Sequence, residues 1–190
     1  MKDENAEVRL GVAKSLYEIF IASDQALLSS SQSILGTFQK DSQYKIREKI
    51  TSTLAKLGVA YGLEVFKANL EALYFNYLTD PVSSVRETGI SSLETLTTKF
   101  GSAWTVNNLI PKLNNYMTQT KTSYLHRIAV LSSIAACAKS LNANQVNDNV
   151  VPSLSKHLKD KIPNVRFFII KTFNNLVSNT DNSGKEKLKR

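Results

Sequence analysis

Five arginines recur at nearly equal intervals, and this spacing restricts the possible folds more than any other feature of the sequence. The successive intervals are 38, 39, 41 and 39 residues, and they separate Arg9, Arg47, Arg86, Arg127 and Arg166. In four of the five copies an aspartate lies six residues before the arginine, and valine or isoleucine lies directly before it. We call this motif the cassette. A motif that returns about every 40 residues predicts a fold built from repeated small units.

Apolar residues accompany each arginine with helical spacing. The residue before the arginine and those four, eight and eleven positions further on are apolar in all five copies, apart from Gly89 and His126. These positions share one stripe of an α-helix, and we expect them in the core. In the first copy they are Val8, Val12, Leu16 and Ile19. A helical pattern also precedes each later cassette, which makes the cassette a turn between two helices. The predicted fold is therefore an all-α HEAT-repeat solenoid of stacked antiparallel helix pairs, with about four and a half repeats.

The repeats define the expected domain organisation. We expect one HEAT-repeat array over residues 1–178, which opens with a partial repeat at 1–23. The full repeats are expected at about 24–61, 62–101, 102–141 and 142–178. Residues 179–190 are polar and carry four basic residues in the last six positions, which predicts a disordered basic tail. Because the sequence opens at a turn, in the middle of a repeat, we expect it to be a fragment of a longer protein.

Enzyme chemistry has little support in the sequence. The two histidines, His126 and His157, lie in separate repeats, which does not suit a pair of metal ligands. The seven glycines are dispersed, so no phosphate-binding loop is recognisable, and no Gly-x-Ser-x-Gly motif occurs. We therefore expect no catalytic residues, no metal site, no cofactor and no enzyme activity. The sequence also shows no apolar run long enough for a membrane span and no signal-peptide pattern.

Cysteine content and charge restrict the location and the partners. The single cysteine, Cys137, falls in a core position, which favours packing over reactivity and a reducing compartment, the cytoplasm and also the nucleus. The formal net charge is +8, from 24 Lys and Arg against 16 Asp and Glu. Such an excess admits an alternative function, a HEAT adaptor for transport or nucleic-acid binding driven by positive charge. The lysines, however, are scattered along the repeats, so we do not expect nucleic acid as the partner.

The aspartate and the arginine of the cassette have a structural interpretation. The aspartate is expected to accept backbone amides at a helix N-terminus. The arginine points sideways and is expected to pair with the aspartate of an adjacent repeat, so that the pairs form a ladder along the array. The fourth copy carries Lys121 in place of the aspartate, which removes one pair from the ladder.

The variable residues between the aspartate and the arginine are better candidates for function. Several are large, notably Tyr44 and Lys45, then Tyr124 and Leu125. These turns are expected to line one edge of the array. Tyrosines and apolar residues flanked by basic residues are typical of protein-binding hot spots. Packing of the turns against neighbouring repeats remains the alternative interpretation.

Short motifs in these repeats resemble the scaffold (A) subunit of protein phosphatase type 2A. The motifs are Asp80-Pro-Val-Ser-Ser-Val-Arg86, Lys99-Phe-Gly-Ser-Ala-Trp104, Ile110-Pro-Lys112, Tyr124-Leu-His-Arg127 and Pro163-Asn-Val-Arg-Phe167. Their order and spacing also agree with that family, and the resemblance covers about residues 3–177. Tyr44 stands where the family usually has tryptophan, and the chain is basic whereas family members tend to be acidic.

The resemblance implies a non-catalytic scaffold that docks the type 2A catalytic subunit through its intra-repeat turns. It implies that a regulatory B-type subunit binds N-terminal repeats that precede those of this sequence. The implied partner-binding residues are Tyr44, Lys45, Arg47, Ser83, Ser84, Tyr124, Leu125, His126, Pro163 and Asn164. A third possibility, a solenoid fragment with no independent partner, stays open at this point.

Overall fold

The computed structural model describes residues 3–23, 25–118 and 123–179, and every regular element in these ranges is helical. The prediction of an all-α helical-repeat fold is therefore confirmed. The chain divides into two compact units, Met1–Lys99 and Phe100–Arg190. Within the described ranges, none of the helices combines the length and the apolar character needed to span a bilayer. The predicted basic tail from residue 180 onward, and Lys121, lie outside the described residues.

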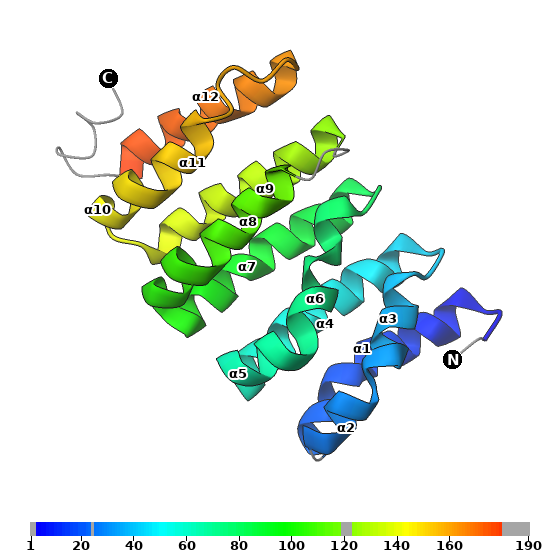
Figure 1. The fold of residues 1–190 in the computed structure, drawn as a ribbon. Helices are drawn as coiled ribbons and strands as arrows, with labels where there is room; N and C mark the ends of the chain where they lie inside the picture. Colours follow the sequence, from blue (N-terminus) through cyan, green and yellow to red (C-terminus); the bar gives the residue numbers. More distant parts are fainter. Residues whose placement is uncertain (1–2, 24, 119–122, 180–190) are drawn as a thin grey trace. The chain divides into compact units, whose positions relative to one another are not determined.

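The first unit begins with a single long helix, followed by helix pairs (Figure 1). Its first elements are α1 (Ala6–Ala22), α2 (Gln25–Ser30), α3 (Gln32–Gln39) and α4 (Tyr44–Tyr61). In each repeat the first helix precedes the cassette and the second helix follows it. The first helix of the next repeat is broken into α5 (Leu63–Val65), a π-helical turn η1 (Phe66–Leu70), α6 (Glu71–Tyr74) and a 3-10 turn η2 (Phe75–Thr79). The unit ends within α7 (Ser83–Trp104), whose backbone leaves the helical conformation at Gly101.

The second unit contains two helix pairs. The first pair consists of the π-helical turn η3 (Thr105–Leu109), α8 (Ile110–Thr118), α9 (Tyr124–Cys137) and a 3-10 turn η4 (Ala138–Ser140). The second pair consists of α10 (Ala143–Gln145), the π-helical turn η5 (Val146–Val150), α11 (Val151–Ser155) and α12 (Pro163–Asn179). The three π-helical turns lie at matching places near the start of the first helix, so a local distortion repeats with the sequence period.

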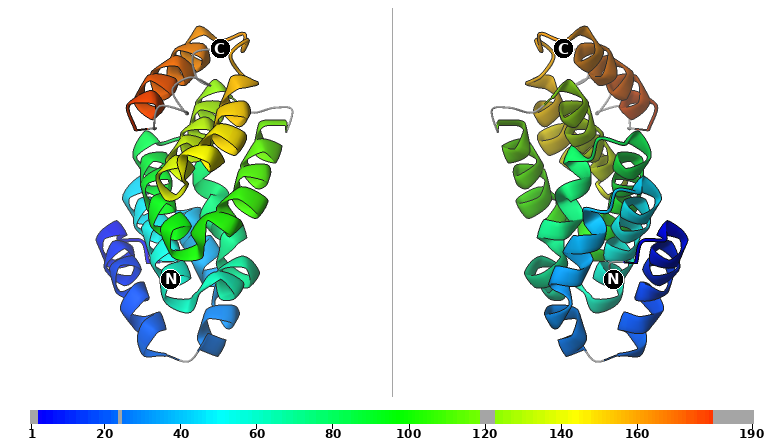
Figure 2. Two further views of the ribbon diagram at one scale, coloured as in Figure 1. Left: turned by 90° about the vertical axis from the view of Figure 1, so that its left-hand side faces the viewer. Right: turned by 90° about the vertical axis from the view of Figure 1, so that its right-hand side faces the viewer.

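Two pairs of second helices, one in each unit, pack side by side. In the first unit α1 lies along α4, and α3 packs against α4 (Figures 1 and 2). In the second unit α9 packs against both α8 and α12. Leu54 and Ile134, on the predicted stripes of α4 and α9, have no exposed surface. The helical register read from the sequence therefore places the core of these repeats correctly.

The stripe predicted for the first copy is only partly buried, which corrects the expectation for α1. Leu16 is buried, but Val8 is 48% exposed and Ile19 is 45% exposed. The helix is buried along a neighbouring line instead, which includes Ala13 and Phe20. The physical reason is that α1 packs mainly on α4, which covers only one side of the helix.

Two glycines make the connections between repeats possible, and a third leaves space for a buried tyrosine ring. Gly62 and Gly101 have φ values of 88° and 86°, a region that side-chain-bearing residues avoid, and each allows a second helix to turn into the next first helix. Gly89 interrupts the predicted apolar stripe of α7 for a different reason. A Cβ atom there would lie 2.1 Å from Cγ of Tyr77, so the missing side chain makes room for a buried ring.

Candidate protein-docking edge

Three arginines pair with the aspartate of the following repeat, which confirms the predicted ladder at these places. In the first unit Nε of Arg47 donates to Oδ2 of Asp80 at 2.7 Å, and Nη2 donates to Oδ1 at 3.0 Å. Arg9 contacts Asp41 at the same two distances. In the second unit Arg127 contacts Asp160 at 2.9 and 3.0 Å. Bidentate pairing fixes the distance and the orientation between two turns.

Four of the cassette arginines also close their own turns. Nη1 of Arg47 donates to the carbonyl oxygen of Asp41 at 2.7 Å, and Nη1 of Arg86 donates to the carbonyl oxygen of Asp80 at 2.6 Å. Arg9 and Arg166 make the equivalent bond. One guanidinium therefore holds the turn of its own repeat and, in Arg9 and Arg47, the turn of the next repeat as well.

The cassette aspartates accept a backbone amide at the start of the helix, as predicted, but the amide belongs to the residue just before the helix and not to a residue within it. Oδ1 of Asp41 accepts the amide of Gln43, two residues along the chain, at 2.9 Å, and Asp80 accepts the amide of Val82 in the same way. This geometry is an Asx turn, and it lies before the helix begins. The N-cap of α4 is Gln43, which makes no side-chain capping bond. The aspartate therefore shapes the turn and leaves the capping position to another residue.

The ion pairs change the acidity of their members. The hydrogen bond from Arg9 lowers the pKa of Asp41, against the opposing effect of burial, with help from the Gln43 amide. Burial raises the pKa of Asp160, but the Ile162 amide and Arg127 outweigh it, and the net shift is downward. Both carboxylates are therefore ionised at neutral pH, as the ladder requires.

In the first unit, the predicted site residues lie on one edge formed by two neighbouring turns. Tyr44 and Lys45 occupy the first turn of α4 and are exposed. Ser83, the first residue of α7, is exposed, whereas Oγ of Ser84 donates to Oε2 of Glu48 at 3.1 Å. The Arg47–Asp80 pair joins these two turns, so Arg47 is already engaged within the unit.

The second unit presents a comparable edge. Tyr124 and Leu125 open α9 and are each 40% exposed, and the following His126 is half-buried. Pro163 and Asn164 open α12 and are exposed. The Arg127–Asp160 pair joins the two turns, so each unit places its predicted turn residues together.

A basic turn in the second unit escaped the sequence reasoning. Lys156, Lys159 and Lys161 are exposed and flank Asp160 in the sequence. Arg127 pairs with the Asp160 carboxylate, and Leu158, between the lysines, is 38% exposed. The sequence signal was the local run Lys-His-Leu-Lys-Asp-Lys. The sequence reasoning treated the lysines as scattered and missed this run. The turn therefore offers cations next to apolar surface. Desolvation lowers the pKa of the neighbouring His157, with Arg127 and Lys156 adding to the effect and Asp160 opposing it.

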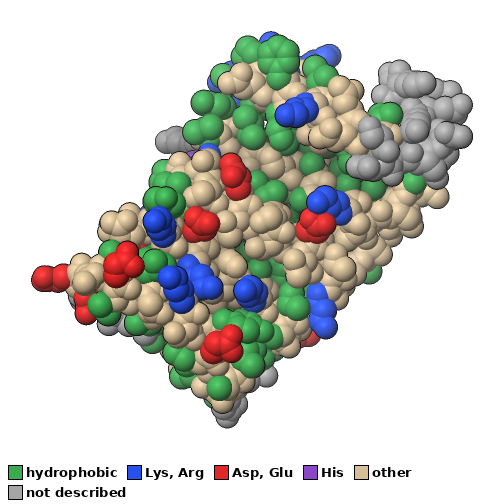
Figure 3. All heavy atoms as spheres, turned by 180° about the vertical axis from the view of Figure 1, so that it is seen from behind, with side chains coloured by type: hydrophobic (Ala, Val, Ile, Leu, Met, Phe, Trp, Pro, Cys, Tyr) green, Lys and Arg blue, Asp and Glu red, His purple; other side chains and the backbone are tan. Residues whose placement is uncertain are grey.

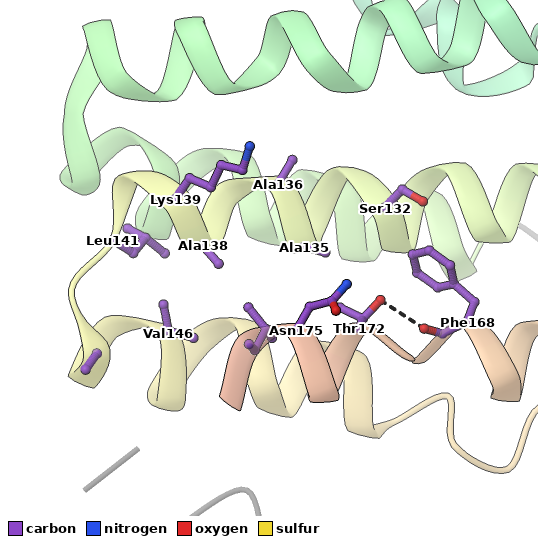
Figure 4. Close-up of a pocket in the computed structure, with 12 residues that line it drawn as sticks. Ser132, Ala135, Ala136, Ala138, Lys139, Leu141, Val146, Phe168, Thr172 and Asn175 are labelled. Atoms are coloured by element: carbon purple, nitrogen blue, oxygen red, sulfur yellow. Dashed lines mark hydrogen bonds between the residues drawn. The ribbon is translucent and has the colours of Figure 1, made fainter. Parts of the chain in front are cut away.

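A groove of about 690 Å³ runs between α9 and α12 (Figure 4). Its wall on α9 is built from small residues, among them Ala135 and Ala136, while Phe168 and Thr172 face it from α12. Small side chains on one helix leave the space between the two helices unfilled. The groove therefore depends on the small side chains of α9 together with the side chains that face them from α12.

Charges of both signs are interspersed on the face drawn in Figure 3, with no continuous field of one sign. A protein that follows a phosphate backbone needs a connected basic surface. This face does not provide one, and the nucleic-acid alternative gains no support from it.

Several known proteins share parts of this sequence. A protein-family model described as "PIK3R4-like, middle domain" matches residues 1–185. The regulatory A subunit of protein phosphatase PP2A from Saccharomyces cerevisiae is 28% identical over 78 residues, which are 41% of this chain and 12% of that protein. The protein of the same name from Schizosaccharomyces pombe is 33% identical over 65 residues, 34% of this chain and 11% of that protein. The resemblance predicted from the short motifs is therefore confirmed, and the chain spans little more than a tenth of the length of these relatives.

One solved structure aligns with nearly the whole of this chain. The crystal structure of an engineered protein aligns over 99% of this chain and 90% of its own, with a TM-score of 0.46 and 14% sequence identity. At that TM-score the likeness supports no statement about fold or function.

Proposed function

We propose that this chain, which belongs to the family of PIK3R4-like middle domains, is a non-catalytic helical-repeat scaffold that docks a protein partner through its intra-repeat turns. One observation carries the proposal. The arginine–aspartate ladder fixes neighbouring turns in register within each unit, and most of the variable residues of those turns stay exposed. A rigid frame that displays variable side chains suits recognition of a protein surface.

The partner that we propose is the catalytic subunit of protein phosphatase type 2A. The two relatives named as regulatory A subunits of PP2A support it, although their matches cover a limited part of each chain. The chemistry of the edges is consistent with a protein partner, because Tyr44 and Tyr124 are exposed aromatic residues and Lys45 and Lys159 lie on the same edges of their units. Such an edge suits a surface with apolar pockets and carboxylates.

The experiment measures binding of the purified full chain to the type 2A catalytic subunit by calorimetry or biolayer interferometry. Tyr124→Ala is expected to weaken binding about tenfold, as loss of an interface aromatic typically does. Lys45→Ala is expected to weaken it less and to reduce its dependence on salt. Lys14→Ala and Ile21→Ala on α1 are controls, because both residues are exposed but lie outside the turns.

Absence of binding by a chain with a helical circular dichroism spectrum would overturn the phosphatase assignment. Equal losses for Tyr124→Ala and for the control Ile21→Ala would overturn docking through the turns. Binding of the same edge to a partner of the PIK3R4-like proteins would keep the scaffold and replace the phosphatase.

Two further expectations remain predictions. A B-type regulatory subunit would contact repeats other than those described for this chain, so we assign it no residue. The cytoplasmic location rests on the cysteine content alone.

A further inference from the structure

The groove between α9 and α12 lies where the first unit carries a tyrosine ring. The eighth residue after the cassette arginine is Tyr17 in α1 and Ala135 in α9. The ninth residue after the arginine of the following repeat is Lys56 in α4 and Asn175 in α12. In the first unit Nζ of Lys56 lies 5.9 Å from the centre of the Tyr17 ring, so a ring and a cation bridge the two helices. In the second unit Ala135 and Asn175 line the open groove instead (Figure 4).

A hollow between α4 and α7 gives a second comparison. There the equivalent residues are Ala55 and Thr95, and the hollow measures about 370 Å³, against about 690 Å³ for the groove of the second unit. Tyr17 and Lys56 contribute to its lining, so the ring already takes part of that space. The groove between α9 and α12 is therefore the larger of the two, and a small side chain stands there at the place of the ring.

The lining of the groove suits a side chain that is apolar with a polar tip. Val146 and Leu176 are buried at its wall, and the Phe168 ring is half-buried beside them. Thr172 and Asn175 add polar groups from α12. An aromatic residue with a hydroxyl group, such as the tyrosine that the first unit carries, combines these two properties.

The second unit is also much more basic than the first. Residues 1–99 contain 11 Lys and Arg against 12 Asp and Glu, whereas residues 100–179 contain nine Lys and Arg against two Asp and Glu. Of these two acidic residues, Asp160 pairs with Arg127. Lys139 lines the groove, and the exposed Lys171 lies one helical turn before Asn175 on the same face of α12. Such a surface complements an acidic ligand.

We propose that this groove binds an acidic segment of a partner protein. An aromatic side chain of the segment takes the place that Tyr17 has in the first unit, and carboxylates beside it face Lys139 and Lys171. The groove is lined from α9, α12 and the segment that joins their repeats, and it includes none of the turn residues of the docking edges. It therefore provides a second contact surface, separate from the one proposed above.

Fluorescence anisotropy with the full chain tests the proposal. The probe is a short fluorescein-labelled peptide in which one Tyr is flanked by Glu and Ala residues. We expect saturable binding that weakens as salt is raised, because charge contributes to the contact. Peptides with Ala in place of Tyr, or with Lys in place of Glu, should bind at least about tenfold more weakly.

A double variant, Ala135→Tyr with Asn175→Lys, copies the pair of the first unit into the groove. The chain should stay folded, because the same pair is accommodated between α1 and α4. It should lose peptide binding although it gains a cation, since its own ring then occupies the groove. Lys139→Glu should weaken binding about tenfold. Lys14→Glu makes the same charge change at an exposed residue of α1 and should leave binding unchanged.

No binding of the acidic peptide by a chain with a helical circular dichroism spectrum would overturn the proposal. Binding that survives in the double variant, or equal losses for Lys139→Glu and Lys14→Glu, would place the peptide elsewhere and overturn it too. A single-stranded oligonucleotide that displaces the probe at a lower concentration than the unlabelled peptide would overturn the choice of a protein ligand. The double variant keeps every turn residue of the docking edges, so its binding to the phosphatase tests the proposed function independently.

Discussion

Replacing Arg47 with alanine removes a side chain that joins two turns of the first unit. The guanidinium donates to Asp80 through Nε at 2.7 Å and Nη2 at 3.0 Å, and to the carbonyl oxygen of Asp41 through Nη1 at 2.7 Å. After truncation the Asp80 carboxylate loses both guanidinium donors and keeps the hydrogen bond from the Val82 amide. Two turns lose their common anchor, and a carboxylate is left partly buried without its countercharge.

The size of the effect follows from the burial of the pair. The side chains of Arg47 and Asp80 are 12% and 9% exposed, which places them between a surface pair and a fully buried one. Surface pairs contribute about 0–1 kcal/mol. Breaking a buried pair costs about 3–5 kcal/mol. We therefore expect Arg47→Ala to lower the free energy of unfolding by about 2–3 kcal/mol.

The matched control is Arg86→Ala in the same unit. Arg86 donates to the carbonyl oxygens of Asp80 and Pro81, and within the described residues it holds no carboxylate. It should therefore lose only the turn-closing bonds, about 1 kcal/mol. Urea unfolding followed by circular dichroism measures the total. Hydrogen exchange of the turn at residues 80–84 reports the first unit separately.

A double-mutant cycle with Asp80→Asn isolates the ion pair from the turn-closing bonds. We expect a coupling energy of about 1–2 kcal/mol between Arg47 and Asp80. Equal costs for Arg47→Ala and Arg86→Ala, together with a coupling near zero, would refute the view that the ladder holds the turns in register.

Three further outcomes follow from local features. Gly89→Ala places a methyl group against the Tyr77 ring and should lower the free energy of unfolding in urea by about 1–3 kcal/mol. Gly11→Ala is the control, because no atom lies within 4 Å of the new Cβ, and it should be neutral or stabilising. The pKa of Asp41 is lowered in the folded state, so its contribution to stability is fully present above the unfolded pKa of about 4 and is lost as pH falls through the lower folded value. An Asp41→Asn variant should therefore lose less stability than the parent chain between pH 7 and pH 3. An equal loss in the two chains would contradict this. Burial raises the pKa of the Cys137 thiol to about 12, so iodoacetamide at pH 8 should modify the denatured chain and spare the folded one.

Much of the fold is predictable because a helical repeat makes most of its contacts between residues that are close in the sequence. The spacing of apolar residues after each arginine predicted the register of Leu54 and Ile134 correctly. The position of the arginine directly after the first core residue predicted the ladder. Gly89 appeared as an interruption of the pattern, and only the structure shows the Tyr77 ring that occupies its place.

The remaining features depend on what lies beside a residue in space. Val8 and Ile19 fit the repeat pattern but are exposed, since burial requires a neighbouring helix as well as a register. The groove beside Ala135 depends on the combined size of side chains on two helices that are distant in sequence. The docking residues were predicted as positions in turns; their exposure and the lysines near Asp160 required the three-dimensional structure.

Arg9 and Arg47 each hold two turns, which makes their repeats similar structural units. Every arginine that pairs contacts the same atoms of the same kind of turn, so the ladder does not depend on the residues between Asp and Arg. Those residues can therefore vary without disturbing the contact that joins one repeat to the next. Recognition can evolve one turn at a time, and length can change by whole repeats, while the joints stay the same.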